Sequence, residues 1–367
     1  MIKRLLSFLL ISTLAGIVAL TSAAIAQQRV VNVYNWSDYI GKDTLEKFTK
    51  ATGIKVVYDV YDSNETLDAK LLTGKTGYDI VVPSGGFLVR QINAGLYQKF
   101  DKSLLPNLKN IDPLLLKALS SFDPKNEYAV PYFWGTIGLG RNVKMINDRM
   151  PNAPVDSLDI IFKPEFAKKF ADCGIVLLDS PSDVFQIALN YLGKDPHSTK
   201  KEDYDLAEKL LLSVRPYIKY FHSSRYIEDL ANGEVCIALG YSGDILIAAT
   251  RAEEAEKGIK IEYTIPKEGT QLWIDSLAMP KDAPHPKEAH AFINFLMDAQ
   301  IAADGVNSVT YASPNQAALP YIDQEIVNNP GVYPPPEVMV RLFGDKEASS
   351  DLKKMRTRSW TKVKTGR

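Results

Sequence analysis

Apolar runs alternate with amphipathic segments along most of this chain. The run at 30–34 is rich in β-branched residues and predicts a strand, as do the apolar runs at 55–61 and 78–83. Segments with helical periodicity follow the first two of these strands, at 44–51 and 65–73. This βαβαβ order predicts a parallel sheet with right-handed crossovers.

A second series of the same kind begins after two short extended runs at 128–131 and 136–141. Further along, the extended run at 259–265 is expected to carry the chain back to the first half of the protein. The segment 284–304 predicts one long amphipathic helix, and a tail helix is expected from Glu337. The second series has predicted strands at 174–178, 217–221 and 235–239, and predicted helices at 184–192, 204–214 and 225–231.

Two α/β lobes, each with a mostly parallel sheet flanked by helices, fit this layout best. The chain would cross between the lobes several times, which permits a hinge and a cleft between them. The expected first lobe comprises residues 27–134 and 260–305, and the expected second lobe comprises 135–259 and 306–367.

Residues 1–26 have the pattern of a secretory signal peptide. Lys3 and Arg4 precede an apolar run at 5–20, and a small-residue site at 24–26 predicts cleavage after Ala26. A membrane anchor is the alternative, but the short apolar core and the small residues favour cleavage. The mature chain is therefore expected in a bacterial periplasm.

Charge and cysteine content narrow the possible functions. The mature chain would hold 41 basic and 44 acidic residues, a slight excess without a nucleic-acid-binding signature. Its two cysteines, Cys173 and Cys236, would lie in an oxidising compartment. A disulfide is the favoured interpretation, and two buried free thiols are the alternative.

Enzyme signatures are incomplete. The sequence at 74–76 resembles the end of a P-loop, but Ala69 stands where the first glycine is needed. The segment 240–243 does not match a nucleophile elbow, and the four histidines have no zinc-site spacing. We therefore expect no catalytic residue, no metal site and no cofactor.

Acidic, aromatic and hydroxyl side chains gather where predicted strands end. The first strand is followed directly by Trp36, Ser37, Asp38 and Tyr39. The alternative is a simple turn in which Ser37 or Asp38 caps the next helix. Ligands of open α/β sheets bind beyond the carboxyl ends of the strands. Similar residues at later strand ends and turns are Ser84, Asp183, Ser223, Tyr241, Asp244, Trp273, Asp275 and Tyr311.

A cleft lined in this way suits an elongated organic cation. Carboxylates accept charge-assisted hydrogen bonds from ammonium groups. Aromatic faces cover methylene groups and attract cations by about 0.5–2 kcal/mol each. For any single residue the alternative is a helix cap or a core position, but the repeated placement at strand ends weakens that alternative for the whole set.

At the level of whole motifs, the chain resembles the periplasmic polyamine-binding proteins of ABC importers, most of all their putrescine-binding branch. The resemblance extends over essentially the entire mature chain. It is carried by VYNWSDYI at 33–40, YDIVVPS at 78–84, NYLG at 190–193, FHSS at 221–224, DLANGEVC at 229–236 and GYSGD at 240–244.

The resemblance implies a type II periplasmic-binding fold that closes on its ligand, and a disulfide at positions matching Cys173 and Cys236. It implies an aromatic box around the methylene chain, made by Trp36, Tyr241 and Trp273. Of the carboxylates, Asp244 and Asp275 would bind one ammonium group, and Asp38 and Asp183 the other end, directly or through water. The rest of the wall would be Ser37, Tyr39, Ser84, Ser223 and Tyr311.

Three positions depart from the putrescine-binding pattern. Tyr241 stands where that branch often has Trp, Asp183 replaces a longer Glu, and Trp273 stands where Phe is common. Tyr241 and Asp183 make two walls of the expected pocket smaller, and Trp273 makes a third wall larger. The reshaped pocket makes spermidine a rival to putrescine as the ligand. A change in an apolar wall changes discrimination by only about 1–3 kcal/mol.

We therefore expect a monomeric carrier that delivers a polyamine to the permease and ATPase of an ABC importer. One alternative is a binding protein for a basic amino acid or an oligopeptide, which would need a cleft arginine for the ligand carboxylate. An exported enzyme acting on amines would need a cofactor lysine or a metal site. A sensor or an adhesin with the same fold is a third alternative.

Overall fold

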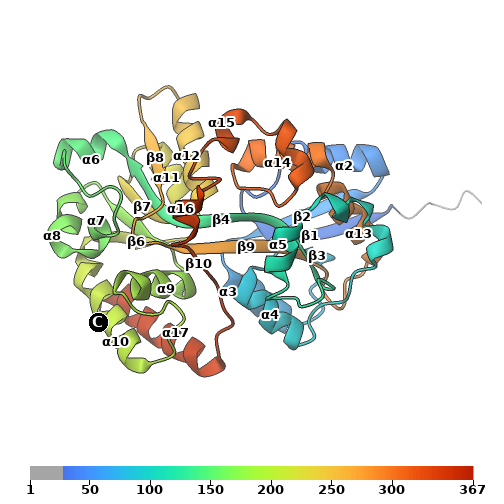
Figure 1. The fold of residues 1–367 in the computed structure, drawn as a ribbon, viewed down its shortest axis with the longest axis horizontal. Helices are drawn as coiled ribbons and strands as arrows, with labels where there is room; N and C mark the ends of the chain where they lie inside the picture. Colours follow the sequence, from blue (N-terminus) through green and yellow to red (C-terminus); the bar gives the residue numbers. More distant parts are fainter. Residues whose placement is uncertain (1–27, 367) are drawn as a thin grey trace, which may run out of the picture.

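The computed structural model describes residues 28–366, so the predicted signal peptide lies outside the described residues. Two lobes lie side by side, and the long strands β4 (Ala129–Asn142) and β9 (Gln271–Ala278) run between them (Figure 1). Each lobe has a sheet covered by helices, and buried apolar side chains form a core that extends through both.

The first lobe has the predicted βαβαβ arrangement. Strand β1 (Val30–Trp36) pairs in parallel with both β2 and β3, and its alternate residues Val31 and Val33 are buried. The remaining members are α2 (Thr44–Thr52), β2 (Lys55–Tyr61), α3 (Asn64–Leu72), β3 (Ile80–Val81), α4 (Gly85–Asn93) and α5 (Pro113–Leu119).

Strand β4 is one continuous crossing rather than two short runs. Its first half pairs antiparallel with β9 in the first lobe, and its second half pairs antiparallel with β7 (Ile237–Tyr241) in the second. Strand β8 (Ile261–Thr264) also pairs with the second half. The run at 259–265 therefore belongs to the second sheet, and the chain crosses back at β9. The exact lobe boundaries stay a prediction.

A close approach explains one glycine of β4. A Cβ atom at Gly138 would lie 2.5 Å from the backbone oxygen of Thr264 in β8. Glycine therefore permits the pairing of these two strands at this point.

The second lobe repeats the alternation, with β5 (Ile175–Leu177) parallel to both β7 and β6 (Ile218–Phe221). Its longer helices are α9 (Pro181–Tyr191), α10 (Lys201–Val214), α11 (Tyr226–Ala231) and α12 (Ser242–Glu254). Its shorter helices are α6 (Val143–Arg149), α7 (Asp159–Phe162) and α8 (Pro164–Ala167). The later part of the chain forms α15 (Gln324–Val327), α16 (Pro336–Met339) and β10 (Phe343–Gly344), which pairs in parallel with β9.

Three helix predictions differ from the structure. The segment 284–304 forms two helices, α13 (Pro286–Leu296) and α14 (Ala299–Val309), because the Asp298 side chain accepts hydrogen bonds from two backbone amides and starts a new helix. Helix α12 was not expected directly after β7. Only one turn forms from Pro336, and the main tail helix is α17 (Ser350–Thr365), which packs against α9 and α10 of the second lobe.

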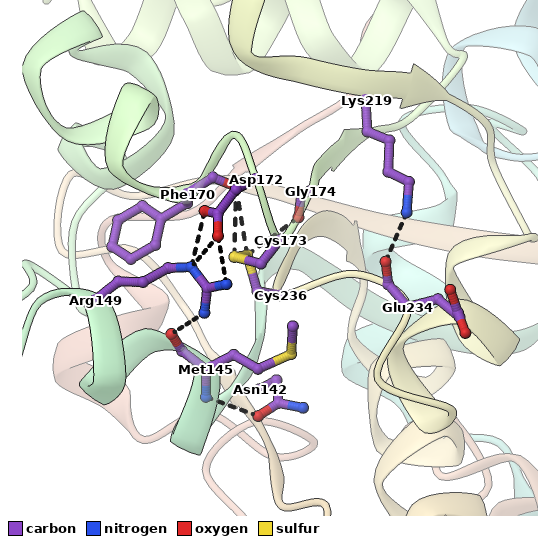
Figure 2. Close-up of a disulfide and its surroundings, with 10 residues drawn as sticks. All are labelled: Asn142, Met145, Arg149, Phe170, Asp172, Cys173, Gly174, Lys219, Glu234 and Cys236. Carbon is purple, nitrogen blue, oxygen red and sulfur yellow. Dashed lines mark hydrogen bonds and ion pairs between the residues drawn. A yellow bond between two sulfur atoms is a disulfide. The ribbon is translucent and has the colours of Figure 1, made fainter.

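A disulfide joins Cys173 and Cys236, with Cα atoms 5.5 Å apart. The two cysteines lie just before the parallel strands β5 and β7, so the bond ties the starts of neighbouring strands. Close to it, Arg149 of α6 binds Asp172 through its guanidinium group (Figure 2). The disulfide prediction is therefore confirmed, and the alternative of free thiols is excluded.

Within residues 28–366, no helix is long and apolar enough to span a membrane.

Candidate ligand-binding site

A narrow cavity of about 50 Å³ lies between the lobes. Every predicted site residue except Asp38 lines it. The lining consists of Trp36, Ser37, Tyr39, Tyr61, Asp62, Asn64, Ser84, Phe87, Ser182, Asp183, Ser223, Ser224, Tyr241, Asp244, Gln271, Trp273, Asp275, Tyr311 and Asp345.

Parallel strands bring part of this lining together. Trp36 ends β1, Tyr61 ends the neighbouring β2, and Ser84 follows β3 in the same sheet. The Trp36 indole N–H donates to the Val82 backbone oxygen over 2.9 Å, and the Trp36 ring lies 4.6 Å from the Tyr61 ring. Because the carboxyl ends of parallel strands share one edge, these side chains reach the same cavity.

Strand β9 supplies a row of residues two apart. Gln271, Trp273 and Asp275 all line the cavity, since alternate side chains of a strand share a face. The Ser84 hydroxyl donates a hydrogen bond to the Asp275 carboxylate. Asp275 is only 4% exposed, and its burial raises its pKa to about 7, although the hydroxyls of Ser84 and Tyr39 favour the charged form.

Asp244 occupies the first turn of α12 and is held by two tyrosines. The Tyr226 hydroxyl donates to its Oδ2 over 2.7 Å, and the Tyr311 hydroxyl donates to its Oδ1 over 2.6 Å. Burial raises the pKa of Asp244 to about 6, and both hydroxyls oppose that rise. The tyrosines thus fix the position of the carboxylate and satisfy part of its hydrogen-bonding capacity.

Asp183 occupies the first turn of α9, where a helix terminus favours negative charge. The Tyr241 hydroxyl donates to its Oδ2 over 3.0 Å. Burial raises the pKa of Asp183 to about 6. Nearby, the Gln271 side-chain oxygen and the Ser223 hydroxyl are buried and have no hydrogen-bond partner in the described residues, so both are available to a ligand.

Aromatic rings form the walls between these carboxylates. The Trp273 ring lies 5.1 Å from Tyr311 and 6.1 Å from Tyr241, in both cases at a steep angle. Tyr39 packs edge-on against Tyr311 at 5.1 Å. All four of these residues line the cavity, so their rings can contact the apolar part of a slender ligand.

Asp38 lies elsewhere. Its carboxylate accepts a 2.9 Å bond from Arg251 of α12, and Arg251 also pairs with Glu228 of α11. Asp38 therefore links the first lobe to the second outside the cavity lining. It is not a helix cap, because the N-cap of α2 is Asp43. Ser37 does not cap α2 for the same reason, and its backbone N–H donates to the Tyr61 backbone oxygen.

The lining contains five aspartates and no Lys, Arg or His. Burial raises the pKa of three of them, Asp183, Asp244 and Asp275, and for Asp244 the positive charge of Arg251 opposes this rise without cancelling it. A bound cation would favour the charged form of these carboxyl groups. Among residues 28–366, no three His, Cys, Asp or Glu side chains are grouped so that they could hold a metal ion.

Several lining residues were not predicted from the sequence. Tyr61 ends a predicted strand and Asp62 follows it, while Gln271 lies two residues before Trp273, so the sequence did carry a signal for these three residues. Asp345 lies in the tail, where no pattern pointed to the cavity. The complete set is Tyr61, Asp62, Asn64, Phe87, Ser182, Ser224, Gln271 and Asp345.

The sequence profile of the bacterial extracellular solute-binding proteins matches residues 43–334, most of the chain. This chain belongs to that family. As a solute-binding protein it has the expected two-lobed α/β fold, and the family prediction is confirmed.

Two curated relatives align along the full length of the chain. The putrescine-binding periplasmic protein SpuD of Pseudomonas aeruginosa is 52% identical over 100% of both chains. The putrescine-binding periplasmic protein PotF of Escherichia coli is 49% identical over 100% of this chain and 99% of its own. Both are periplasmic binding proteins.

A solved structure shows the same fold. The spermidine/putrescine ABC transporter substrate-binding protein PotD from Streptococcus pneumoniae superposes with a TM-score of 0.73 and 29% identity. The alignment covers 92% of this chain and 99% of that protein. The fold prediction is therefore confirmed at the level of the whole chain.

Proposed function

We propose that this solute-binding protein captures a linear polyamine, such as putrescine or spermidine, and delivers it to the permease of an ABC importer. The observation that carries the proposal is the lining of five carboxylates without a basic side chain, walled by aromatic rings. Buried cations require paired anions, because an uncompensated buried charge is strongly unfavourable. The relatives that bind putrescine add independent support.

Each end of the ligand has its own carboxylates. Asp244 and Asp275 are assigned to one ammonium group, and Asp183 to the other. The rings of Trp36, Tyr241 and Trp273, which line the same cavity as the acids, cover the methylene chain. The wall is completed by Ser37, Tyr39, Ser84, Ser223 and Tyr311.

Asp38 is assigned an indirect role. Its ion pair with Arg251 connects the lobes and favours the closed arrangement around the ligand. This assignment replaces direct contact with the ligand, because Asp38 is not part of the cavity lining.

The transport role places the mature protein in the periplasm after cleavage of the leader behind Ala26. The protein acts as a monomer that performs no chemistry on its ligand, and its partners are the membrane permease and the ATPase of the importer. Relatives that are periplasmic binding proteins support this role.

A basic amino acid fits the cavity less well. Its α-carboxylate needs a cationic partner, and the lining offers none among the described residues. A thermal-shift panel on ligand-stripped protein tests this distinction with putrescine, spermidine, arginine and glutamate. We expect the melting temperature to rise with the polyamines only. A larger rise with arginine than with either polyamine would refute the proposed ligand class.

A further inference from the structure

A second cavity, of about 260 Å³, lies beside the ligand-binding cavity. Helices α3 and α4 of the first lobe form one side of it, and α9 with the tail leading into α17 forms the other (Figure 1). Phe87, Ser182 and Asp345 line both cavities and separate them. Four basic side chains line this second space, which we name the basic cavity: Arg90, Lys346, Lys353 and Arg356.

Arg356 is the most informative of these residues. It is only 6% exposed, yet the one hydrogen bond of its side chain in the described structure runs from Nε to the Tyr204 hydroxyl, over 2.8 Å. Its guanidinium also stacks 5.7 Å from the Tyr204 ring. No described carboxylate lies within 4 Å of its nitrogens. A buried guanidinium without an anion is costly, so this arrangement points to a missing anionic partner.

The other basic groups of this cavity also lack some of the anionic or hydrogen-bonding partners that they could bind. No described carboxylate lies within 4 Å of the ammonium groups of Lys346 and Lys353. Arg90 pairs with Asp68, but its buried Nε has no hydrogen-bond partner. Lys353 and Arg90 both lie 5.5 Å from the Phe87 ring, so cations from the two lobes meet at one aromatic side chain.

The positive charge of the basic cavity contributes to lowering the pKa of two neighbouring groups, Lys353 and His197. The pKa of Lys353 is lowered by burial and by Arg90 and Arg356, although Asp68 and Glu347 oppose this. The pKa of His197 is lowered by burial and by Lys346 and Arg356.

Two acids of the cavity wall, Asp68 and Asp345, already have partners among the described residues. Asp68 is paired with Arg90, and Asp345 accepts hydrogen bonds from the Gly86 backbone and from Gln186. The pKa of Glu65 is raised to about 7 by burial and by Asp183, so this carboxyl group is partly neutral near pH 7. These acids therefore leave the basic cavity with an excess of positive charge.

We propose that the basic cavity binds a small polyvalent oxyanion of the phosphate type between the two lobes. Guanidinium groups bind oxyanions through paired N–H donors, and lysines add point charges, which suits phosphate better than chloride. The anion would contact Arg90 of the first lobe and Lys353 or Arg356 of the second. It therefore stabilises the closed arrangement, and by linkage it strengthens binding of the ligand in the neighbouring cavity.

The test is a calorimetric titration of sodium phosphate into the mature protein, with sodium chloride holding the ionic strength constant. We expect saturable binding and a rise in melting temperature, with sulfate competing and chloride not. Lys353→Gln and Lys346→Gln should each weaken phosphate binding at least fivefold. The matched control is Lys354→Gln, an exposed neighbour on the same helix, which should change it less than twofold.

Arg356→Gln is a less suitable variant, because it also removes the contact with Tyr204. The proposal is wrong if phosphate gives neither heat nor a thermal shift, or if Lys353→Gln and Lys354→Gln behave alike. A second readout is the affinity for putrescine, which should rise severalfold with phosphate in the wild type and not in Lys353→Gln. Only this second readout rests on the proposed function. A failure of phosphate binding can therefore be distinguished from a failure of polyamine binding.

Discussion

Replacing Asp275 with Asn removes the charge of a buried cavity carboxylate and keeps its shape almost unchanged. In the proposed complex this carboxylate binds an ammonium group in a buried site beside Ser84. A hydrogen bond to a charged group contributes about 1.5–3 kcal/mol, and breaking a buried ion pair costs about 3–5 kcal/mol. A loss of about 2–4 kcal/mol is therefore expected, which weakens binding by about 30- to 700-fold.

The same substitution should stabilise the ligand-free protein. The pKa of Asp275 lies at about 7 instead of 3.8, because burial disfavours the charged form. A carboxyl group whose pKa is raised on folding costs stability as the pH rises from about 4 through about 7. This cost approaches about 4 kcal/mol at high pH, and Asn, which does not ionise, avoids it.

Both effects can be measured on one preparation. Calorimetry with putrescine gives the dissociation constant, and urea unfolding of ligand-free protein at pH 5 and pH 8 gives the stability. Asp282→Asn, at an exposed carboxylate beyond β9, serves as the control and should change neither quantity. An Asp275→Asn variant that binds within threefold of the wild type would refute the assignment of this carboxylate to an ammonium group.

Four further predictions follow from the same geometry. Asp38→Asn breaks an exposed ion pair that contributes about 0.2–1 kcal/mol, so ligand release measured by stopped flow should be about 1.5- to 5-fold faster. An unchanged release rate would show that Asp38 does not stabilise the closed arrangement. The three buried acids, whose pKa values are about 6–7, must ionise to hold a dication, so affinity should fall from pH 8 to pH 5. Binding near pH 6.5 should release protons, seen as heats that differ between buffers; equal heats would contradict this. Replacing both Cys173 and Cys236 with Ser removes a disulfide between residues that are 63 positions apart in the sequence. The free energy of unfolding, measured in urea, should fall by about 2–4 kcal/mol. Trp273→Ala should weaken putrescine binding by about 2- to 30-fold in calorimetry, the range of one lost cation–π contact, and unaltered binding would show that this ring does not face the ligand.

Local patterns were sufficient to predict most strands and the parallel order of the first sheet. The strand at 55–61 was located to the residue, because valines and tyrosines make up most of it and turn residues bound it. The patterns failed where tertiary contacts decide. The segment 284–304 is apolar on one face throughout, and only the cap at Asp298 divides it into two helices. Strand β4 is continuous because it pairs with β9 and then with β7.

The site was predicted well where residues follow parallel strands, because strand ends converge by topology. Asp38 has the same sequence context as Ser37, but the turn directs it to Arg251 instead of into the cavity. Asp345 enters the wall from the tail, where its carboxylate accepts a hydrogen bond from the Gly86 backbone. Such a long-range contact leaves no local pattern in the sequence.

The most direct test of the central claim is calorimetric titration of putrescine and spermidine into refolded, ligand-stripped mature protein. Stripping is necessary because a tightly bound ligand can survive purification. We predict saturable one-to-one binding of at least one of the two polyamines. Absence of binding by both polyamines, in protein shown by circular dichroism to be folded, would contradict the claim that this acidic, aromatic cavity is a polyamine site.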